Sequence, residues 1–215
     1  MVDEWENILK SSTTEQIMDL RKAVKVCFSK VRISHMEGAS PLHMATFSGQ
    51  LSLVQFIIGK SVDKNPKDEN GWTPLHLAAK KGYLEIFKAV NECCNNKNPR
   101  KNDGYTPLCS AASNGQFEVC KYILKEMRTA GSPLLLWEDQ RENSGFTPLH
   151  LAAEMGHFDT YRYIIENVAE KNPRDNFGFT PLDFAKNQRI HASRFFGAEK
   201  HLIVKYMASN YPKIA

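Results

Sequence analysis

A short motif that recurs five times limits what this chain can fold into more than any other feature of its sequence. Each copy reads Gly, any residue, Thr or Ser, Pro and Leu, and three of the copies continue with His. The copies begin at Gly38, Gly71, Gly104, Gly145 and Gly178, so their glycines are 33, 33, 41 and 33 residues apart. A fixed period of this length is typical of repeat proteins, in which each unit packs mainly on its neighbours.

The residue types in each copy predict a tight turn followed by two short helices. Glycine takes the positive φ of a turn, Thr or Ser is a common helix N-cap, and Pro suits the first helical position. A second glycine, such as Gly82, ends the first helix, and apolar residues then recur at helical spacing, as in Leu84, Phe87 and Val90. One unit has too little core to fold alone, so we expect the units to stack.

Two segments carry the fullest form of the motif, GWTPLHLAAKKG at Gly71–Gly82 and GFTPLHLAAEMG at Gly145–Gly156. They resemble the ankyrin repeat, whose signature is Thr-Pro-Leu-His-x-Ala on a period of about 33 residues. The resemblance covers residues 38–185 directly. It implies an all-α fold, an ankyrin-repeat solenoid of stacked helix-turn-helix units with β-hairpin loops.

The histidine of the motif is present in three copies and replaced in two. The resemblance implies that His43, His76 and His150 hold the turns by hydrogen bonds, and that none of them binds a metal or acts in catalysis. Cys109 and Asp183 stand at this position in the third and fifth copies. We expect Cys109 to weaken its turn locally.

We expect the whole chain, residues 1–215, to form a single ankyrin-repeat domain. Its segments are a capping repeat at 1–37, repeats at 38–70, 71–103, 104–144 and 145–177, and a C-terminal repeat with its cap at 178–215. Within the caps we predict a first helix through Trp5, a second one capped near Thr13, and a closing helix over residues 198–208.

Two departures from the period are candidates for function. Eight extra residues lie within residues 128–140, where Leu134 to Trp137 form an apolar cluster that either anchors a partner or packs back on the repeats. The loop at residues 189–197 combines two phenylalanines with two arginines. That combination suits either stacking on nucleic-acid bases or packing on the last helices.

Composition narrows the compartment and the chemistry. The chain has five cysteines and no Cys-x-x-Cys pair, and we interpret them as buried free thiols in a reducing compartment, the cytoplasm or the nucleus. No apolar run is long enough to span a membrane. We find no phosphate-binding glycine loop, metalloprotease motif or nucleophile motif. We therefore predict no enzyme activity, no cofactor, no metal and no small-molecule substrate.

Charge is unevenly distributed along the chain. The net charge is +4, yet residues 38–185 are close to neutral, which disfavours nucleic acid as a ligand of the repeats. Residues 186–215 hold six basic residues against Glu199 alone. An alternative function is therefore that this basic C-terminal segment binds nucleic acid or an anionic membrane while the repeats recruit something else.

Candidate binding residues follow from the resemblance. Ankyrin-repeat proteins bind partners on their concave face, through loop tips and the exposed side of the first helices, and the resemblance implies the same here. Carried over position by position, the candidate partner-binding residues are Lys67, Glu69, Trp72, Lys80, Lys81, Arg100, Tyr105, Arg141, Phe146, Met155, Arg174 and Phe179.

The residue after the motif glycine is aromatic in four copies, as Trp72, Tyr105, Phe146 and Phe179. In stacked repeats these rings would form a ladder along one edge of the binding groove, where they either anchor a partner or cover the neighbouring loop. The arginines at one position of three loops would suit an acidic partner. The sequence thus predicts a non-catalytic protein-protein interaction module, an adaptor or an inhibitor, with an unidentified protein as its partner.

Overall fold

The computed structural model describes residues 13–19, 37–129, 141–186 and 197–213. The chain divides into two compact units, unit 1 at Met1–Asn102 and unit 2 at Asp103–Ala215. This division lies one residue from a predicted repeat boundary. That the whole chain forms a single domain stays a prediction. Within the described ranges, no helix is both long and apolar enough to cross a membrane.

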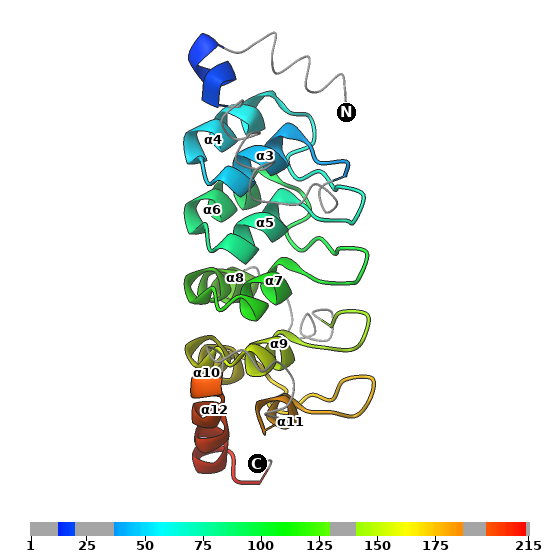
Figure 1. The fold of residues 1–215 in the computed structure, drawn as a ribbon, viewed down its shortest axis with the longest axis vertical. Helices are drawn as coiled ribbons and strands as arrows, with labels where there is room; N and C mark the ends of the chain where they lie inside the picture. The colour runs from blue at the N-terminus through cyan, green and yellow to red at the C-terminus, as the bar shows by residue number, and fades with distance from the viewer. Residues whose placement is uncertain (1–12, 20–36, 130–140, 187–196, 214–215) are drawn as a thin grey trace. The chain divides into compact units, whose positions relative to one another are not determined.

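Unit 1 contains two complete pairs of helices. These four helices are α3 (Pro41–Ser48), α4 (Leu51–Lys60), α5 (Pro74–Lys81) and α6 (Leu84–Cys93) (Figure 1). The first helix of one repeat packs on the first helix of the next, α3 on α5, and the second helices do the same, α4 on α6. Each first helix also packs on its own second helix, so the repeats form two layers of helices.

Unit 2 follows the same plan over three repeats. Its helices are α7 (Pro107–Ser113), α8 (Phe117–Thr129), α9 (Pro148–Met155), α10 (Phe158–Asn167), α11 (Pro181–Lys186) and α12 (Gly197–Asn210). In the first layer α9 packs on both α7 and α11, and in the second layer α10 packs on both α8 and α12. The predicted closing helix is confirmed as α12, which buries Ile203 and Met207.

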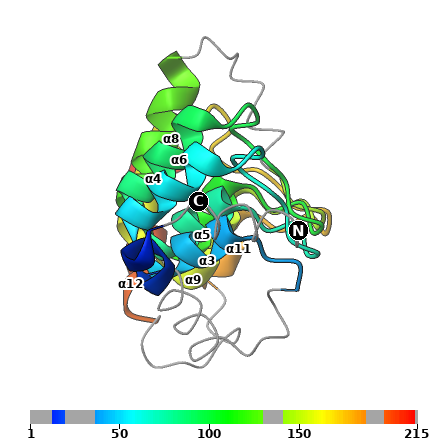
Figure 2. The ribbon, with the colours of Figure 1, turned by 90° about the horizontal axis from the view of Figure 1, so that it is seen from above.

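The loops that link successive repeats project to one side of each unit. Seen from above, the order across each unit is second helices, first helices and then these loops (Figure 2). None of the described residues is in a β-strand, so the expected β-hairpin loops are tight turns in this part of the chain. In unit 1 the C-terminal end of the first helix α5 lies close to the loop before it, because Lys80 Nζ is 5.0 Å from the ring centroid of Trp72.

The predicted helix caps are confirmed. Thr73 caps α5, because its hydroxyl accepts the backbone N–H of His76 while its own N–H donates to His76 Nδ1 over 3.3 Å. Ser40 and His43 form the same reciprocal pair at the start of α3. Near the N-terminus, Thr13 pairs with a glutamine three residues later, and residues 14–19 are helical.

Asp183 takes over the capping role of the histidine in the fifth copy. Its Oδ2 accepts the N–H of Thr180 over 2.8 Å, and its own N–H donates to Thr180 Oγ1 over 3.3 Å. Burial acts to raise the pKa of Asp183, but the hydrogen bonds from Thr180 outweigh it and lower that pKa. In the third copy Thr106 still accepts the N–H of Cys109, over 3.3 Å.

Small and apolar side chains form the core between the layers. Ala78 and Ala79 of α5 are fully inaccessible to solvent, and so are Ile57 of α4 and Val90 of α6. Alanines at these positions let neighbouring helices approach closely. The apolar residues that recur at helical spacing in the second helices thus form the buried side of these helices, as predicted.

The cysteines follow the prediction with one exception. Cys94, Cys109 and Cys120 are buried free thiols, and burial raises the pKa of Cys94 and of Cys120. Cys93 is exposed, so its predicted burial is wrong. It is the last residue of α6 and lies next to Cys94, and adjacent residues at a helix end point in different directions, so only one of them faces the core.

Several predicted features lie outside the described residues. They are the helix through Trp5, the thiol of Cys27, the apolar cluster from Leu134 to Trp137, and most of the loop at 189–197.

Candidate functional site

Three of the described inter-repeat loops are closed by their own backbone and by an acidic side chain. In the second repeat the N–H of Asp68 donates to the carbonyl of Trp72 over 2.9 Å. Asp68 Oδ1 accepts the N–H groups of Asn70 and Trp72, over 2.9 and 2.7 Å. Glu142 and Asp175 do the same in the fourth and fifth repeats. The acidic position of the loop is therefore structural.

Successive loop tips are joined to one another within each unit. In unit 1 the N–H of Asn102 donates to the carbonyl of Asn70 over 3.2 Å, and Asn102 Nδ2 donates to the carbonyl of Glu69 over 2.9 Å. The approach is so close that a Cβ on Gly71 would lie 2.7 Å from Asn102 N. In unit 2 the same contacts join Asn176 to the preceding tip. The tips form a stacked edge with a fixed conformation.

The motif histidines link this edge to the first helices. Nε2 of His43 lies 3.0 Å from the carbonyl oxygen of Trp72, and Nε2 of His150 lies 3.1 Å from that of Phe179. Nδ1 accepts a backbone N–H in both rings, so the proton is on Nε2, which donates to the carbonyl. Burial lowers the pKa of His43 to about 4. The predicted structural role is confirmed for these two histidines.

In unit 1 two lysines approach the ring of Trp72. Lys101 Nζ lies 4.2 Å and Lys80 Nζ 5.0 Å from the ring centroid. Beside them, Lys81 Nζ lies 4.3 Å from the ring centroid of Phe47. All three distances are within the range of cation–π attraction. We call these five residues, Phe47, Trp72, Lys80, Lys81 and Lys101, the basic–aromatic cluster.

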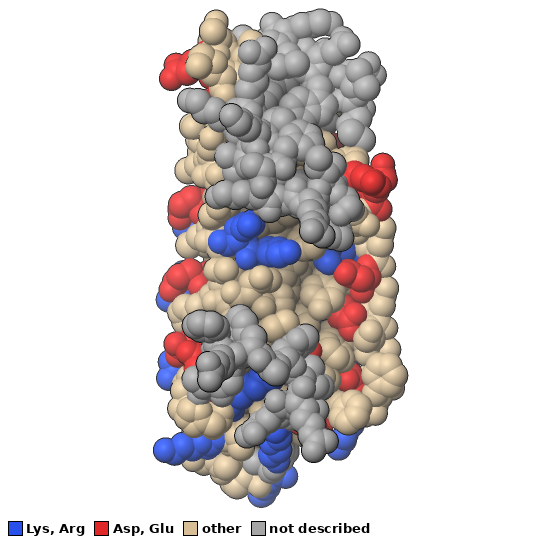
Figure 3. All heavy atoms as spheres, viewed as in Figure 1, with Lys and Arg blue, Asp and Glu red and all other residues tan. Residues whose placement is uncertain are grey.

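The cluster concentrates positive charge on one face of unit 1. Figure 3 shows basic side chains gathered over α5, with acidic side chains at the loop tips beside them. Partial burial lowers the pKa of Lys80, and the like charges of Lys81 and Lys101 lower it further. The carboxylates at the tips are the exposed side chains of Glu37 and Glu69. The three lysines of the cluster therefore lie close together, beside loop tips that carry the acidic Glu37 and Glu69.

In unit 2 the aromatic position is surrounded by rings. Phe146 stacks on His150, with centroids 5.6 Å apart and an interplanar angle of 18°, and meets Phe184 edge-on at 5.0 Å. Phe179 meets the same Phe184 at 6.1 Å, yet 54% of its surface is exposed. Tyr105 is half-buried, and burial raises its pKa. Phe146 therefore packs against the histidine of its own helix and against a ring of α11.

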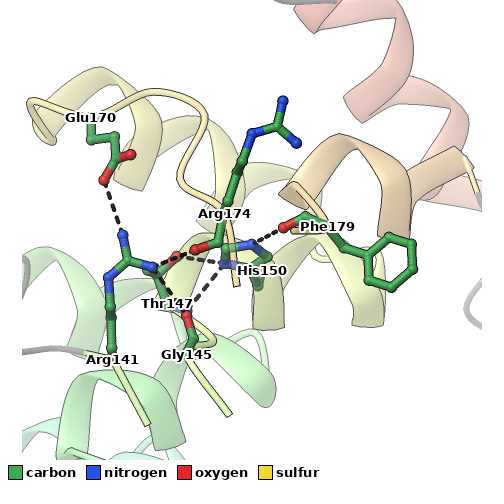
Figure 4. A network of polar contacts seen from close by, with 7 residues as sticks. All are labelled: Arg141, Gly145, Thr147, His150, Glu170, Arg174 and Phe179. Atoms are coloured by element: carbon green, nitrogen blue, oxygen red, sulfur yellow. Dashed lines mark hydrogen bonds and ion pairs between the residues drawn. The ribbon is translucent and has the colours of Figure 1, made fainter. Parts of the chain in front are cut away.

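Arg141 is held by acceptors of the chain itself. Its Nη1 donates to the carbonyls of Gly145 and Arg174, over 3.2 and 2.6 Å, and its Nη2 lies 3.2 Å from Glu170 Oε2 (Figure 4). Arg174 makes only the first kind of contact, over 2.7 Å to the carbonyl of Gly178, and its side chain is exposed. The guanidinium of Arg141 fastens one loop to the next.

The predicted binding residues fall into both units. Those in unit 1 are Lys67, Glu69, Trp72, Lys80, Lys81 and Arg100, and those in unit 2 are Tyr105, Arg141, Phe146, Met155, Arg174 and Phe179. Lys67, Glu69, Lys80 and Lys81 are exposed, whereas Arg100 and Met155 are half-buried. The structure brings Trp72 and Lys80 together.

Lys101 belongs to the cluster but is not among the residues predicted from the sequence. A signal for it exists in the repeat alignment, because Lys101 stands where the other loops have Asp68, Glu142 and Asp175. A lysine cannot accept the two backbone N–H groups that those acids accept. The signal that identifies Lys101 is therefore a basic residue at a position where the other described loops have a structural acid.

The described residues offer no cluster of three or more His, Cys, Asp or Glu side chains that would hold a metal ion. A groove of about 440 Å³ lies in unit 1 between the loops around Val62 and Cys93. Lys67 lines it, but none of the cluster residues does. The basic–aromatic cluster is a surface feature separate from this groove.

Comparison with known families identifies the repeat. A family model described as ankyrin repeats (3 copies) matches residues 20–92, 42–133 and 132–208, and together these matches cover most of the chain. They confirm the resemblance seen in the motif and the all-α repeat fold. No curated protein matches the chain. Ankyrin repeats are generally protein-protein interaction modules, and their fold is typically non-catalytic.

Proposed function

Because the chain belongs to the ankyrin-repeat family, we propose that it is a non-catalytic adaptor or inhibitor that binds a protein partner through its loop tips and first helices. The observation that carries this proposal is the basic–aromatic cluster on α5 and its neighbouring loop. Aromatic and long basic side chains are the types that contribute most to binding energy when a partner covers them.

The residues at the end of α5 are not dictated by the core. Leu75, Ala78 and Ala79 complete the packing of this helix and are fully buried, whereas Lys80 and Lys81 are exposed. The corresponding pair in α9 is Glu154–Met155, so different residues fit the same position of the fold. Positions that the fold leaves open are those at which a repeat protein specifies its partner.

The internal contacts of unit 2 narrow the proposed surface. Arg141 and Phe146 are engaged with the loop edge and with neighbouring rings, so we assign them a supporting role in partner binding. The exposed Lys67, Lys80 and Lys81 of unit 1 and the exposed Phe179 of unit 2 are the proposed points of direct contact.

The proposal is tested by affinity capture from a native extract, with proteins identified by mass spectrometry. One variant reverses three charges on the proposed surface, Lys67→Glu, Lys80→Glu and Lys81→Glu. A matched variant reverses three exposed charges elsewhere, Lys97→Glu, Lys121→Glu and Lys125→Glu. We expect a protein that the wild type and the matched variant capture equally and that the surface variant loses.

Two results would contradict the proposal. Both variants would capture the same proteins as the wild type if the partner bound another surface. No protein would be enriched by the wild type if the chain had no protein partner. Thermal unfolding of each variant is the control for folding. We expect every variant to unfold at nearly the temperature of the wild type, since exposed lysines contribute little to stability.

A further inference from the structure

We propose that the basic–aromatic cluster binds a protein segment rich in aspartate and glutamate, whose carboxylates pair with its three ammonium groups. This inference rests on the proposed function and specifies the chemistry of the partner at that surface. The sequence predicts that the loop arginines would bind an acidic partner, whereas this inference assigns that role to lysines, because Arg141 already donates to acceptors within unit 2.

The geometry of the cluster holds its cations in place. Lys80 comes from the end of α5 and Lys101 from the loop after α6, and their ammonium groups approach the same ring, that of Trp72. Lys81 points instead toward the ring of Phe47 in the neighbouring helix α3. Lysine side chains lose much conformational freedom when they bind a ligand, and a side chain already held by a ring loses less. The cluster is therefore arranged in advance for an anion.

The charges of the cluster favour a carboxylate ligand. Lys80 lies near enough to Lys81 and Lys101 for their like charges to act on it, and these repulsions add to the partial burial that lowers its pKa. A carboxylate between the ammonium groups would relieve the repulsion and favour the charged form of each lysine. Close complementary charges also give an interface its specificity and fast association.

Lys101 itself points to a role outside the loop. In the other three loops an acid at this position accepts two backbone N–H groups, as Asp68 does. In the loop of Lys101, Asp103 Oδ1 accepts the N–H of Tyr105 over 3.1 Å and supplies part of that contact. The loop thus has a lysine at the position of the usual acidic residue, and this lysine is the second cation over the ring of Trp72.

The surroundings of the cluster favour a short acidic segment over a nucleic acid. The exposed Glu37 and Glu69 lie on tips joined by the hydrogen bond from the Glu69 N–H to the Glu37 carbonyl, 3.1 Å long. A nucleic-acid backbone needs a continuous basic track, and these carboxylates interrupt it. The cluster also contains lysines and no arginine, the side chain that binds phosphate in two-point geometry. We therefore assign carboxylates as the ligand groups.

The test measures fluorescence anisotropy of a fluorescein-labelled, glutamate-rich peptide titrated with the full chain. We expect binding that weakens as salt is added, because the interaction is between charges near the surface. Lys80→Gln and Lys101→Gln should each weaken binding about tenfold, the loss that corresponds to one charged hydrogen bond. Lys97→Gln removes an exposed lysine outside the cluster and should leave the Kd unchanged. Lys101→Arg keeps the charge and should restore most of the binding.

Several results would overturn the inference. The Kd of the labelled peptide would be unaffected by Lys80→Gln and Lys101→Gln if it bound elsewhere. A matched peptide with glutamine in place of glutamate would bind equally well if charge were not recognised. A phosphoserine peptide or a single-stranded DNA of equal charge would bind more tightly if the site were made for phosphate.

The capture experiment separates this inference from the proposed function. If the captured partner still binds a chain that carries Lys80→Gln, Lys81→Gln and Lys101→Gln, the acidic-segment inference is wrong while the chain remains a protein-binding module. If the wild type captures no protein at all, the proposed function fails and the inference fails with it.

Discussion

Trp72 in unit 1 and Phe146 in unit 2 occupy the same position of the repeat and have different neighbours. Both rings contact the motif histidine of their own helix, but two ammonium groups approach the ring of Trp72, whereas Phe146 lies against the ring of Phe184. The backbone before each ring is the same, a glycine with positive φ, and so is the N-cap after it. The difference shows that the repeat fixes where a ring stands, and that the residues in which the repeats differ decide whether cations or a second ring contact it.

Basic side chains are also used differently in the two units. In unit 1 three lysines gather at the surface around two rings. In unit 2 Arg141 is held by two carbonyls and by Glu170, and the end of α9 has Glu154 and Met155. On this comparison the proposed anion site belongs to unit 1, and in unit 2 the guanidinium of Arg141 joins two loops.

The comparison assumes that each unit has a tightly stacked loop edge of its own, and glycine substitutions test this. In Gly145→Ala the new Cβ would lie 2.4 Å from Asn176 Oδ1, and in Gly71→Ala it would lie 2.7 Å from Asn102 N. We expect each to lower the free energy of unfolding by about 4 kcal/mol, from the left-handed φ and the overlap together. Gly178→Ala has a similar φ and open space around it, so we expect about 1 kcal/mol. Urea denaturation measures all three, and equal losses would show that the edge is loose.

The motif histidine makes stability depend on pH. Burial holds the pKa of His43 at about 4, below its ordinary value of 6.5. As the pH falls from 6.5 to 4, the unfolded chain takes up a proton that the folded chain does not, so stability decreases over this range and levels off below it. This difference in the pKa of His43 between the unfolded and the folded chain corresponds to a decrease of about 3 kcal/mol in the free energy of unfolding.

The variant His43→Gln isolates this contribution. We expect it to be less stable than the wild type at neutral pH and to lose less stability between pH 6.5 and 4, as followed by urea denaturation at a series of pH values. The other titrating groups are common to both chains, so the difference between the two curves reports His43. Parallel curves would mean that His43 is not held neutral.

Arg141 and Arg174 have the same position in their loops and different numbers of partners. Arg141→Gln removes a guanidinium with three acceptors, and we expect it to lower the free energy of unfolding by about 2 kcal/mol. Arg174→Gln removes an exposed side chain with one acceptor, and we expect about 0.5 kcal/mol. Neither substitution should change the Kd of the glutamate-rich peptide. A weaker peptide complex with unchanged stability would assign Arg141 to binding instead.

The fold of this chain could be predicted from its sequence because the determining interactions are local and repeated. Thr73 and His76 cap a helix through residues three apart, and a second glycine such as Gly82 ends it, so a fixed spacing predicts both. The partner of Arg141 could not be predicted in this way. Its acceptors are a carbonyl 33 residues away and Glu170, and the position in the motif does not distinguish it from Arg174.

The binding surface could be predicted only in part, for a related reason. Lys80 and Lys81 were expected at the surface from their place in the repeat, whereas the meeting of Lys80 and Lys101 on one ring depends on how the next loop stacks on Trp72. Exposure of Cys93 likewise depends on which of two adjacent thiols turns toward the core. Residues that belong to the repeat follow its period, and residues that distinguish one repeat from another need the packed structure.

The substitution Lys101→Asp separates the needs of the fold from those of the binding site. It restores the acid found at this position in the other loops, which accepts backbone N–H groups of its own loop as Asp68 does. We expect the free energy of unfolding to rise by about 1 kcal/mol, the net value of one added hydrogen bond after the contact with Trp72 is lost. The same change replaces a cation of the cluster by an anion, so the Kd of the glutamate-rich peptide should increase by more than the roughly tenfold expected for Lys101→Gln. Lys97→Asp introduces the same charge change in the same loop but outside the cluster, and should affect neither quantity in this way. If Lys101→Asp lowered both stability and binding, Lys101 would be a residue that the loop itself requires. The contrast between the proposed anion site of unit 1 and the loop contacts of Arg141 in unit 2 would then lose its strongest support.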